Sequence, residues 1–162
     1  MPSDLIVYAC LATGISSALV AGVFLSFSDF VMASLIAARS TDGIEAMQMI
    51  NRKVFRSVFL VMLLGMGPVS LAFALYAHLY LTGAAYGWII AGTLIYLIGV
   101  IGVTIFCNVP MNKRLDGMAL SDDQTADYWK IYGSLWTRWN HVGTFGSLAT
   151  AICFLLASVG LA

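Results

Sequence analysis

The longest stretch of the chain without a charged side chain runs from Ser57 to Asn112. A transmembrane helix needs about 20 apolar residues to cross roughly 30 Å of hydrocarbon, so this stretch is too long for one crossing and right for two. The sequence Thr-Gly-Ala-Ala-Tyr-Gly at 82–87 is typical of a tight turn. The stretch therefore predicts two membrane-spanning helices, at about 55–81 and 87–108.

Two more apolar stretches are long enough to cross a bilayer. One separates Asp4 from Asp29 and predicts a span at about 5–30, and the other ends the chain and predicts a span at about 139–161. Composition agrees, because 10% of the residues are charged, against about a quarter in soluble domains. We therefore expect an all-α, four-transmembrane-helix bundle that forms a single integral membrane domain, residues 1–162.

A further helix is expected between the third and fourth spans, over about 121–136. Ser121 suits its N-cap position, and two aspartates follow in the first turn, where negative charge is favourable. Aromatic side chains recur along it at helical spacing: Tyr128, Trp129, Tyr132 and Trp136. This pattern predicts an amphipathic surface helix that lies along the cytoplasmic face of the membrane before the last span.

The basic residues indicate the orientation of the chain. All 8 Lys and Arg residues lie in the first and third connecting loops, and such residues are enriched in cytoplasmic loops. We therefore expect both termini on the non-cytoplasmic side, with a bacterial inner membrane as the location. The formal net charge of zero gives no support for nucleic-acid binding. The expected partners are the membrane and a hydrophobic small molecule or lipid.

Polar side chains gather where the four predicted spans meet the cytoplasmic side. These residues are Asp29, Asn51, Arg52, Asn108, Asn112, Asn140 and His141. Asn108 and Asn112 share one helix face if Pro110 does not break the turn between them. Polar groups at this depth are costly unless they face the bundle interior and find partners. Their common depth predicts a polar site inside the bundle.

Structural roles compete with functional ones at several of these positions. Asn51 and Asn108 are equally suited to capping helix ends. Asp29 is suited to an ion pair with Arg52, and basic residues such as Arg52 commonly set topology or contact lipid headgroups. These alternatives stay open at the level of the sequence.

The aromatic and imidazole side chains also have simpler interpretations. Trp129, Trp136 and Trp139 are more often interfacial anchors than surfaces on which a substrate stacks. A lone histidine at a helix entrance is usually a hydrogen-bonded structural residue. The functional interpretation of His141 therefore depends on its place in the polar layer.

The potential metal ligands are few. The only histidines, His78 and His141, lie near opposite ends of their spans, so one chain cannot bind a haem with both. No cysteine belongs to a CxxC pair, and all three sit in apolar stretches, which predicts small buried residues. A mononuclear site that uses His141, Asp29 and asparagine side chains is thinly supported. No metal site is predicted, while dependence on a metal or haem, including one held between subunits, stays open.

Several short blocks of the chain resemble the anthrone oxygenase family of small four-span membrane proteins. These blocks are Gly22–Phe24, Phe30–Met32, Gly43–Gln48, Ile50–Arg52, Asn108–Asn112 and Trp136–His141. The Asn-x-Pro-x-Asn and Trp-Asn-His sequences are the more specific ones. Many members have Arg two places after the His, where this chain has Gly143. A contact of that Arg with an anionic group is then lost here, or Arg138 supplies it.

The resemblance implies the oxidation of an anthrone to an anthraquinone, with dioxygen as co-substrate and no cofactor predicted. As a hypothesis, His141 would act as general base and take a proton from the flat, apolar substrate. Hydrogen bonds from Asn108, Asn112 and Asn140 would stabilise the enolate oxygen, and Arg52 would add positive potential. The residues expected to bind the substrate are Trp136, Trp139, Trp129, Asn51 and Asp29.

A non-enzymatic function uses the same residues. The polar layer would then bind a lipid headgroup or a hydrophobic small molecule, or hold a homo-oligomer together as a structural subunit. Oxygen uptake with a flat phenolic substrate separates an enzyme from a binding protein.

Overall fold

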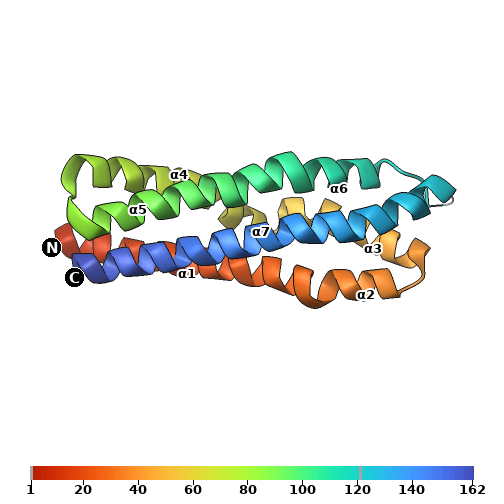
Figure 1. Ribbon diagram of the computed structural model, residues 1–162, viewed down its shortest axis with the longest axis horizontal. Coiled ribbons are helices and arrows are strands. Elements are labelled where there is room, and N and C mark those ends of the chain that lie inside the picture. The colour runs from red at the N-terminus through yellow and green to blue at the C-terminus, as the bar shows by residue number, and fades with distance from the viewer. Residues whose placement is uncertain (1, 121) are drawn as a thin grey trace.

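Four long helical rods form the protein in a computed structural model, which describes residues 2–120 and 122–162 (Figure 1). The first rod is α1 (Pro2–Ser26), η1 (Phe27–Val31) and α2 (Met32–Ala37), and the second is α3 (Ser40–Lys53), η2 (Val54–Arg56) and α4 (Val58–Tyr80). The third is α5 (Gly83–Ile95), η3 (Tyr96–Gly102), η4 (Thr104–Asn108) and α6 (Val109–Asp116), and the fourth is α7 (Asp123–Leu161). No described residue lies in a β-strand.

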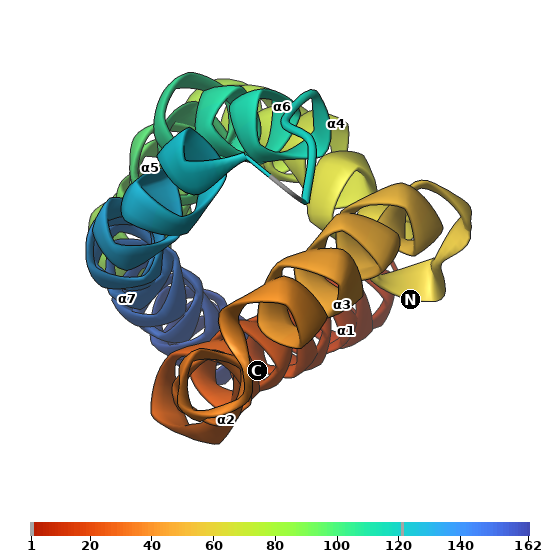
Figure 2. The same cartoon turned by 90° about the vertical axis from the view of Figure 1, so that its right-hand side faces the viewer.

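The rods surround a common axis as an antiparallel bundle. In one layer α1 packs on α7 and α4, and α5 packs on α4 and α7 (Figure 2). Both chain termini lie at the same end of the bundle (Figure 1). Each rod contains a helix long and apolar enough to cross a membrane, which confirms the predicted all-α bundle of four spans.

Three of the rods are continuous helices much longer than a membrane is thick. The helix α7 has 39 residues, or about 58 Å at 1.5 Å per residue, against roughly 30 Å of hydrocarbon. In contrast, α4 has 23 residues, or about 35 Å. The second rod breaks after η2, where the Ser57 side chain accepts a hydrogen bond from the Leu60 amide at 3.2 Å and so caps α4. The bundle therefore has a membrane layer built on α4 and an extension in which α3 takes the fourth position.

The extension consists of α2, α3, α6 and the first half of α7. Its core is formed by Met32, Ile44, Met47, Leu115, Tyr128, Trp129, Tyr132 and Trp136. The Gln48 amide joins α3 to the end of α6 by donating to the carbonyl oxygens of Leu115 at 2.8 Å and Met118 at 3.1 Å. Aromatic packing and these hydrogen bonds hold the extension together as a second, shorter bundle.

The segment 121–136 differs from its prediction as a separate surface helix. Ser121 lies outside the described residues, and from Asp123 onward the segment is continuous with the last span as the start of α7. Its N-cap is Asp122, whose side chain accepts a hydrogen bond from the Gln124 amide at 2.9 Å. The aromatic side chains predicted to contact lipid are buried in the core of the extension. They point inward because α3 and α6 supply an apolar surface for them to pack against. The sequence alone did not indicate where that surface would lie.

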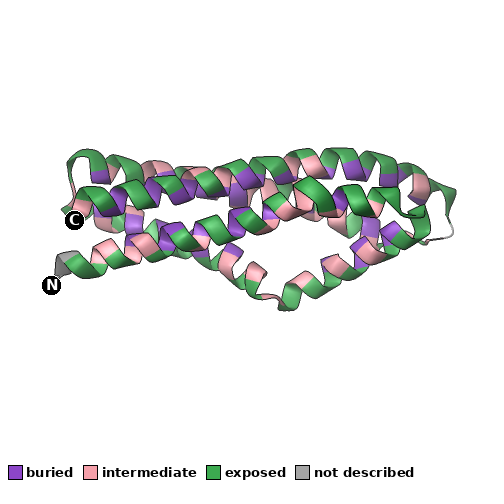
Figure 3. Cartoon of the chain, turned by 90° about the horizontal axis from the view of Figure 1, so that it is seen from below, coloured by how far each residue is buried: buried purple, intermediate pink, exposed green. Residues whose placement is uncertain are grey.

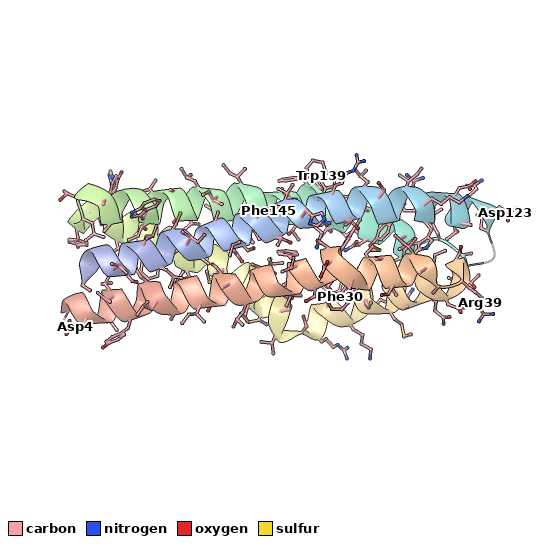
Figure 4. All side chains as sticks on the ribbon, turned by 60° about the horizontal axis from the view of Figure 1, so that its bottom comes forward. Asp4, Phe30, Arg39, Asp123, Trp139 and Phe145 are labelled. Atoms are coloured by element: carbon pink, nitrogen blue, oxygen red, sulfur yellow. The ribbon has the colours of Figure 1, made fainter. Side chains whose placement is uncertain are left out.

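The outer surface changes character where α3 meets α4. Along α4 the exposed side chains include Val58, Val61, Leu71 and Leu75, whereas α3 exposes Asp42, Glu45, Arg52 and Lys53. Buried residues line the inside of both layers, and exposed residues cover the outside (Figure 3). Asp4 lies at the end of the bundle with the termini, and Arg39 and Asp123 lie at the opposite end (Figure 4). The change falls at the break between α3 and α4.

Candidate functional site

A cavity of about 200 Å³ lies at the level of that break. Its apolar walls come from η1 and the end of α1, from α3, and from the start of α4, and include Val23, Phe24, Phe27, Met47, Ile50, Phe59, Leu60 and Leu63. Its polar lining residues are Asn51, Arg52, Thr104, Asn108, Asn112, Lys113, Asp116 and Asn140. A small, mostly apolar pocket with a few polar groups is the usual form of a site for a hydrophobic ligand.

Two π-helical segments form part of the cavity wall. Phe27 belongs to η1, while Thr104 and Asn108 belong to η4. In η4 the Val109 amide donates to the carbonyl of Thr104, five residues earlier. Such wide turns are rare and occur frequently at functional sites. Pro110 follows in the first turn of α6, where its missing amide hydrogen is tolerated. The helix therefore runs through Pro110, and Asn108 and Asn112 both line the cavity.

The side chain of Asn112 is fixed by two hydrogen bonds from α7. Its Oδ1 accepts from the Tyr132 hydroxyl at 2.8 Å and from the Trp136 indole nitrogen at 2.8 Å. With the oxygen doubly occupied, the amide plane is set and its Nδ2 remains a donor. The packing of Tyr132 against Trp136, with ring centroids 6.1 Å apart, supports this arrangement.

Two other amides of the site hold helices together. Asn140 donates from Nδ2 to the Phe24 carbonyl and to the Ser28 hydroxyl, both at 2.6 Å. Asn108 donates from Nδ2 to the Trp136 carbonyl at 3.3 Å. Both amide side chains therefore hold neighbouring helices together. Their side-chain oxygens make no hydrogen bond to the described residues.

Asn51 differs from the other three amides. It is 7% exposed, and its Nδ2 atom has no hydrogen-bond partner among the described residues. The Asn51 side chain lies beside the Tyr132 hydroxyl and lowers the Tyr132 pKa as a hydrogen-bond donor would, against the larger effect of burial, which raises it. The contact does not meet the distance and angle of a hydrogen bond. A buried donor without a partner costs about 1–3 kcal/mol, so such groups are rare in folded proteins. Because Asn51 lines the cavity and lies beside Tyr132, its candidate partners are the Tyr132 hydroxyl and an acceptor oxygen of a ligand.

Charged side chains form one edge of the cavity. Arg52 of α3 donates from Nε to Oδ1 of Asp116 at the end of α6, at 2.7 Å. Lys113 lies on the same helix as Asp116 and also lines the cavity. Asp29 is exposed on η1 and is not part of the lining, so the proposed ion pair between Asp29 and Arg52 is corrected to one between Arg52 and Asp116.

Of the ten residues predicted for the site, the structure brings six into one cavity. Those six are Asn51, Arg52, Asn108, Asn112, Trp136 and Asn140. The other four are absent from the lining: Asp29, Trp129, Trp139 and His141. His141 is exposed on α7, one residue beyond Asn140 and so about 100° further around the helix. It therefore lies outside the cavity, and the predicted general-base role has no support from its position.

The tryptophans outside the cavity have other surroundings. Trp129 is buried in the extension and stacks on Tyr132, with ring centroids 5.5 Å apart. Trp139 is half-buried on α7 and is not among the residues that line the cavity. Neither is placed to stack on a molecule in the cavity.

Gly143 has a packing role in place of the arginine expected from the resemblance. A Cβ atom at this position would lie 3.3 Å from the Phe24 ring, which lines the cavity. Arg138 is exposed and is not among the lining residues, so it does not replace that arginine inside the site. The guanidinium available to the cavity is that of Arg52.

The sequence interpretation missed Asp116 and most of the apolar wall. Asp116 follows Lys113 and Arg114 in what looked like a polar loop, and only the ion pair with Arg52 reveals its position at the cavity. The rings of Phe24, Phe27 and Phe59 lie in apolar stretches, where nothing in the sequence separates a cavity wall from lipid-facing residues. Among the described residues, no three His, Cys, Asp or Glu side chains are grouped to hold a metal ion.

Fold and cavity together define a class: a small integral membrane protein of four long helical rods with a mostly apolar cavity between them. The chain belongs to the anthrone oxygenase family, whose model matches residues 52–153. The matched range contains α4 to α6 and most of α7, and therefore includes Asn108, Asn112, Asp116 and Asn140. No curated protein and no solved structure matches the chain.

Proposed function

We propose that the cavity binds a flat, apolar phenolic or anthrone-like molecule and that the protein catalyses its oxidation by dioxygen. The supporting observation is the buried, unpartnered Nδ2 of Asn51 at the polar end of an apolar cavity. An oxygen substituent of the ligand would accept hydrogen bonds from Asn51 and Asn112, beside the positive charge of Arg52. Family membership favours this chemistry over simple binding.

The reaction balances without a further reactant. A ring methylene loses two hydrogens and gains one oxygen to become a carbonyl. One atom of dioxygen becomes the carbonyl oxygen, and the other leaves as water with the two hydrogens. Donors directed at an oxygen that gains negative charge stabilise the transition state. Because the deprotonated ring is electron-rich, we propose that it reacts with dioxygen without a resident metal or haem. Metal analysis of active, purified protein should then show less than one equivalent of any transition metal.

Asn51→Leu tests the site directly. The substitution removes the donor but also removes an unsatisfied buried group, so thermal stability in detergent should not fall. Affinity for anthrone, measured by equilibrium dialysis without oxygen, should fall about tenfold, equivalent to roughly 1.4 kcal/mol, and oxygen consumption should fall with it. Gln124→Leu removes an exposed amide at the start of α7 and serves as the matched control. Equal affinity in the Asn51→Leu and wild-type proteins would contradict the proposal.

A protein that binds a lipid or hydrophobic molecule without chemistry is the second candidate. The cavity has apolar walls with hydrogen-bond donors and cations at one edge. Such a lining supports binding of a ligand equally well whether or not a reaction follows. The two functions separate in one measurement, because only an oxidase consumes oxygen above the spontaneous rate when anthrone is supplied.

We also propose a bacterial inner membrane as the location, with the extension in the cytoplasm. The support is that all 8 Lys and Arg residues belong to the segments on the side of the α3–α4 break that carries the extension, or to the break itself. This distribution fits the enrichment of basic residues on the cytoplasmic side.

A further inference from the structure

Proton removal from a ring methylene needs a group in the cavity that can accept a proton. The polar lining consists of four neutral amides, one hydroxyl, two cations and one carboxylate. Amides and hydroxyls are very weak bases, and Arg52 and Lys113 already carry their protons. Among the described lining residues, Asp116 is the carboxylate and therefore the group with the chemistry of a general base.

The position of Asp116 leaves part of its carboxylate available. Its Oδ1 accepts a hydrogen bond from Arg52 Nε at 2.7 Å, while no hydrogen bond from the described residues reaches Oδ2. The side chain is 39% exposed, so it has access both to the cavity and to water. A group in that position can take a proton from a ligand and release it to solvent.

We propose that Asp116 is the general base that removes the proton from the ring carbon of the bound molecule, with Arg52 holding the carboxylate in place. This inference rests on the proposed function. The C–H bond breaks, the proton moves to a carboxylate oxygen of Asp116, and the electron pair enters the ring as an enolate. The enolate oxygen takes hydrogen bonds from Asn51 and Asn112. Dioxygen then oxidises this anion, and the proton on Asp116 passes to water.

Hydrogen exchange without oxygen isolates this step from oxidation. The purified protein is mixed with anthrone in D₂O under anaerobic conditions, and deuterium incorporation at the methylene is followed by NMR. Wild-type protein should accelerate exchange above the rate without protein. Asp116→Asn should lower the accelerated rate by about 100-fold or more, the usual contribution of a general base. Binding of anthrone, measured by dialysis, should change less than threefold.

The Asn substitution also separates catalysis from positioning. An amide oxygen at this place still accepts the hydrogen bond from Arg52, so Arg52 keeps its partner while the base is lost. Asp116→Glu keeps a carboxylate and should recover a measurable part of the exchange. Asp127→Asn removes an exposed carboxylate of α7 that pairs with Lys130 away from the cavity, and should exchange like wild type.

The outcomes of the two proposals are distinct. If Asp116→Asn exchanges deuterium within threefold of wild type, Asp116 is not the base, even when binding and oxidation by the wild type hold. If wild-type protein does not bind anthrone at all, the proposed function itself fails. If wild-type protein binds and oxidises anthrone but never accelerates exchange, the base step is wrong and the binding site stands.

Discussion

The amide side chains of the site divide their hydrogen-bonding capacity between holding the fold and facing the cavity. Asn140 donates two hydrogen bonds, one to α1 and one to η1. The side-chain oxygen of Asn112 accepts hydrogen bonds from two aromatic side chains of α7. Asn51 alone among the four has its nitrogen buried without a partner. Of the four amides, Asn112 is thus the one whose orientation is fixed by hydrogen bonds to its oxygen while its nitrogen remains a donor, so binding at Asn112 requires little reorganisation.

Replacing Asn112 with Leu should lower stability. The variant leaves the Tyr132 hydroxyl and the Trp136 indole nitrogen without their acceptor, and each unpaired buried donor costs about 1–3 kcal/mol. For two donors we expect a loss of about 2–6 kcal/mol in unfolding free energy, measured by thermal or denaturant unfolding in detergent. The exposed Gln124→Leu variant should unfold like wild type. Unchanged stability in Asn112→Leu would show that these two hydrogen bonds contribute nothing net.

At the residue scale, the depth of the site along the helices was predictable. The side of each helix that faces the site was not. The change from charged to uncharged sequence fixes where each span begins, so Asn51, Asn108 and Asn140 could be placed at one level. The side of a helix that faces inward depends on packing, and neighbouring residues differ by about 100°. For that reason Asn140 and His141 were both expected at the site, while the structure has Asn140 in the cavity wall and His141 outside it.

At the scale of elements, α2 and α3 approach each other closely at a glycine. A Cβ atom on Gly43 would collide with the carbonyl oxygen of Leu35 and would come within 3.2 Å of the Trp129 ring. Only glycine permits this contact between the two helices. The approach brings Met47 of α3 into the aromatic core of the extension and Asn51 into the cavity wall.

Gly43→Ala should therefore separate α2 from α3. Overpacking of this kind usually costs about 1–3 kcal/mol, and we expect that loss of stability together with weaker ligand binding, because α3 carries Asn51 and Arg52. Thermal unfolding and dialysis with anthrone measure the two effects. Gly22→Ala is the matched control, since a Cβ atom there meets nothing within 4 Å. A Gly43→Ala protein as stable as Gly22→Ala would contradict the close approach.

Element patterns also explain why the segment before the last span was assigned to the membrane surface. Aromatic residues at helical spacing indicate one apolar face, and lipid or protein can cover such a face equally well. The deciding partners are Ile44 and Met47 of α3 and Leu115 of α6, which come from parts of the chain far away in sequence. The helix was predictable, and the surface that covers it was not.

At the scale of the whole molecule, the termini share one end of the bundle and the charged loops share the other (Figures 1 and 4). Positive charge then predicts that a reporter fused after Ala162 is active only on the non-cytoplasmic side. A reporter inserted after Gly117, at the other end, should be active only in the cytoplasm. Alkaline phosphatase reports the periplasmic side and a fluorescent protein reports the cytoplasmic side. The opposite pattern would show that the orientation is the reverse of the one proposed.

With the extension in the cytoplasm, as proposed, the cavity lies where the lipid-facing layer gives way to the charged extension, so it borders two phases at once. Phe55, at its lipid side, is 71% exposed, while Arg52 and Asp116 form its aqueous side. A molecule dissolved in hydrocarbon can therefore enter without crossing water. Under the proposed function, the height of the cavity in the bilayer lets a substrate reach the site from the lipid on one side while the proton taken by Asp116 leaves to water on the other.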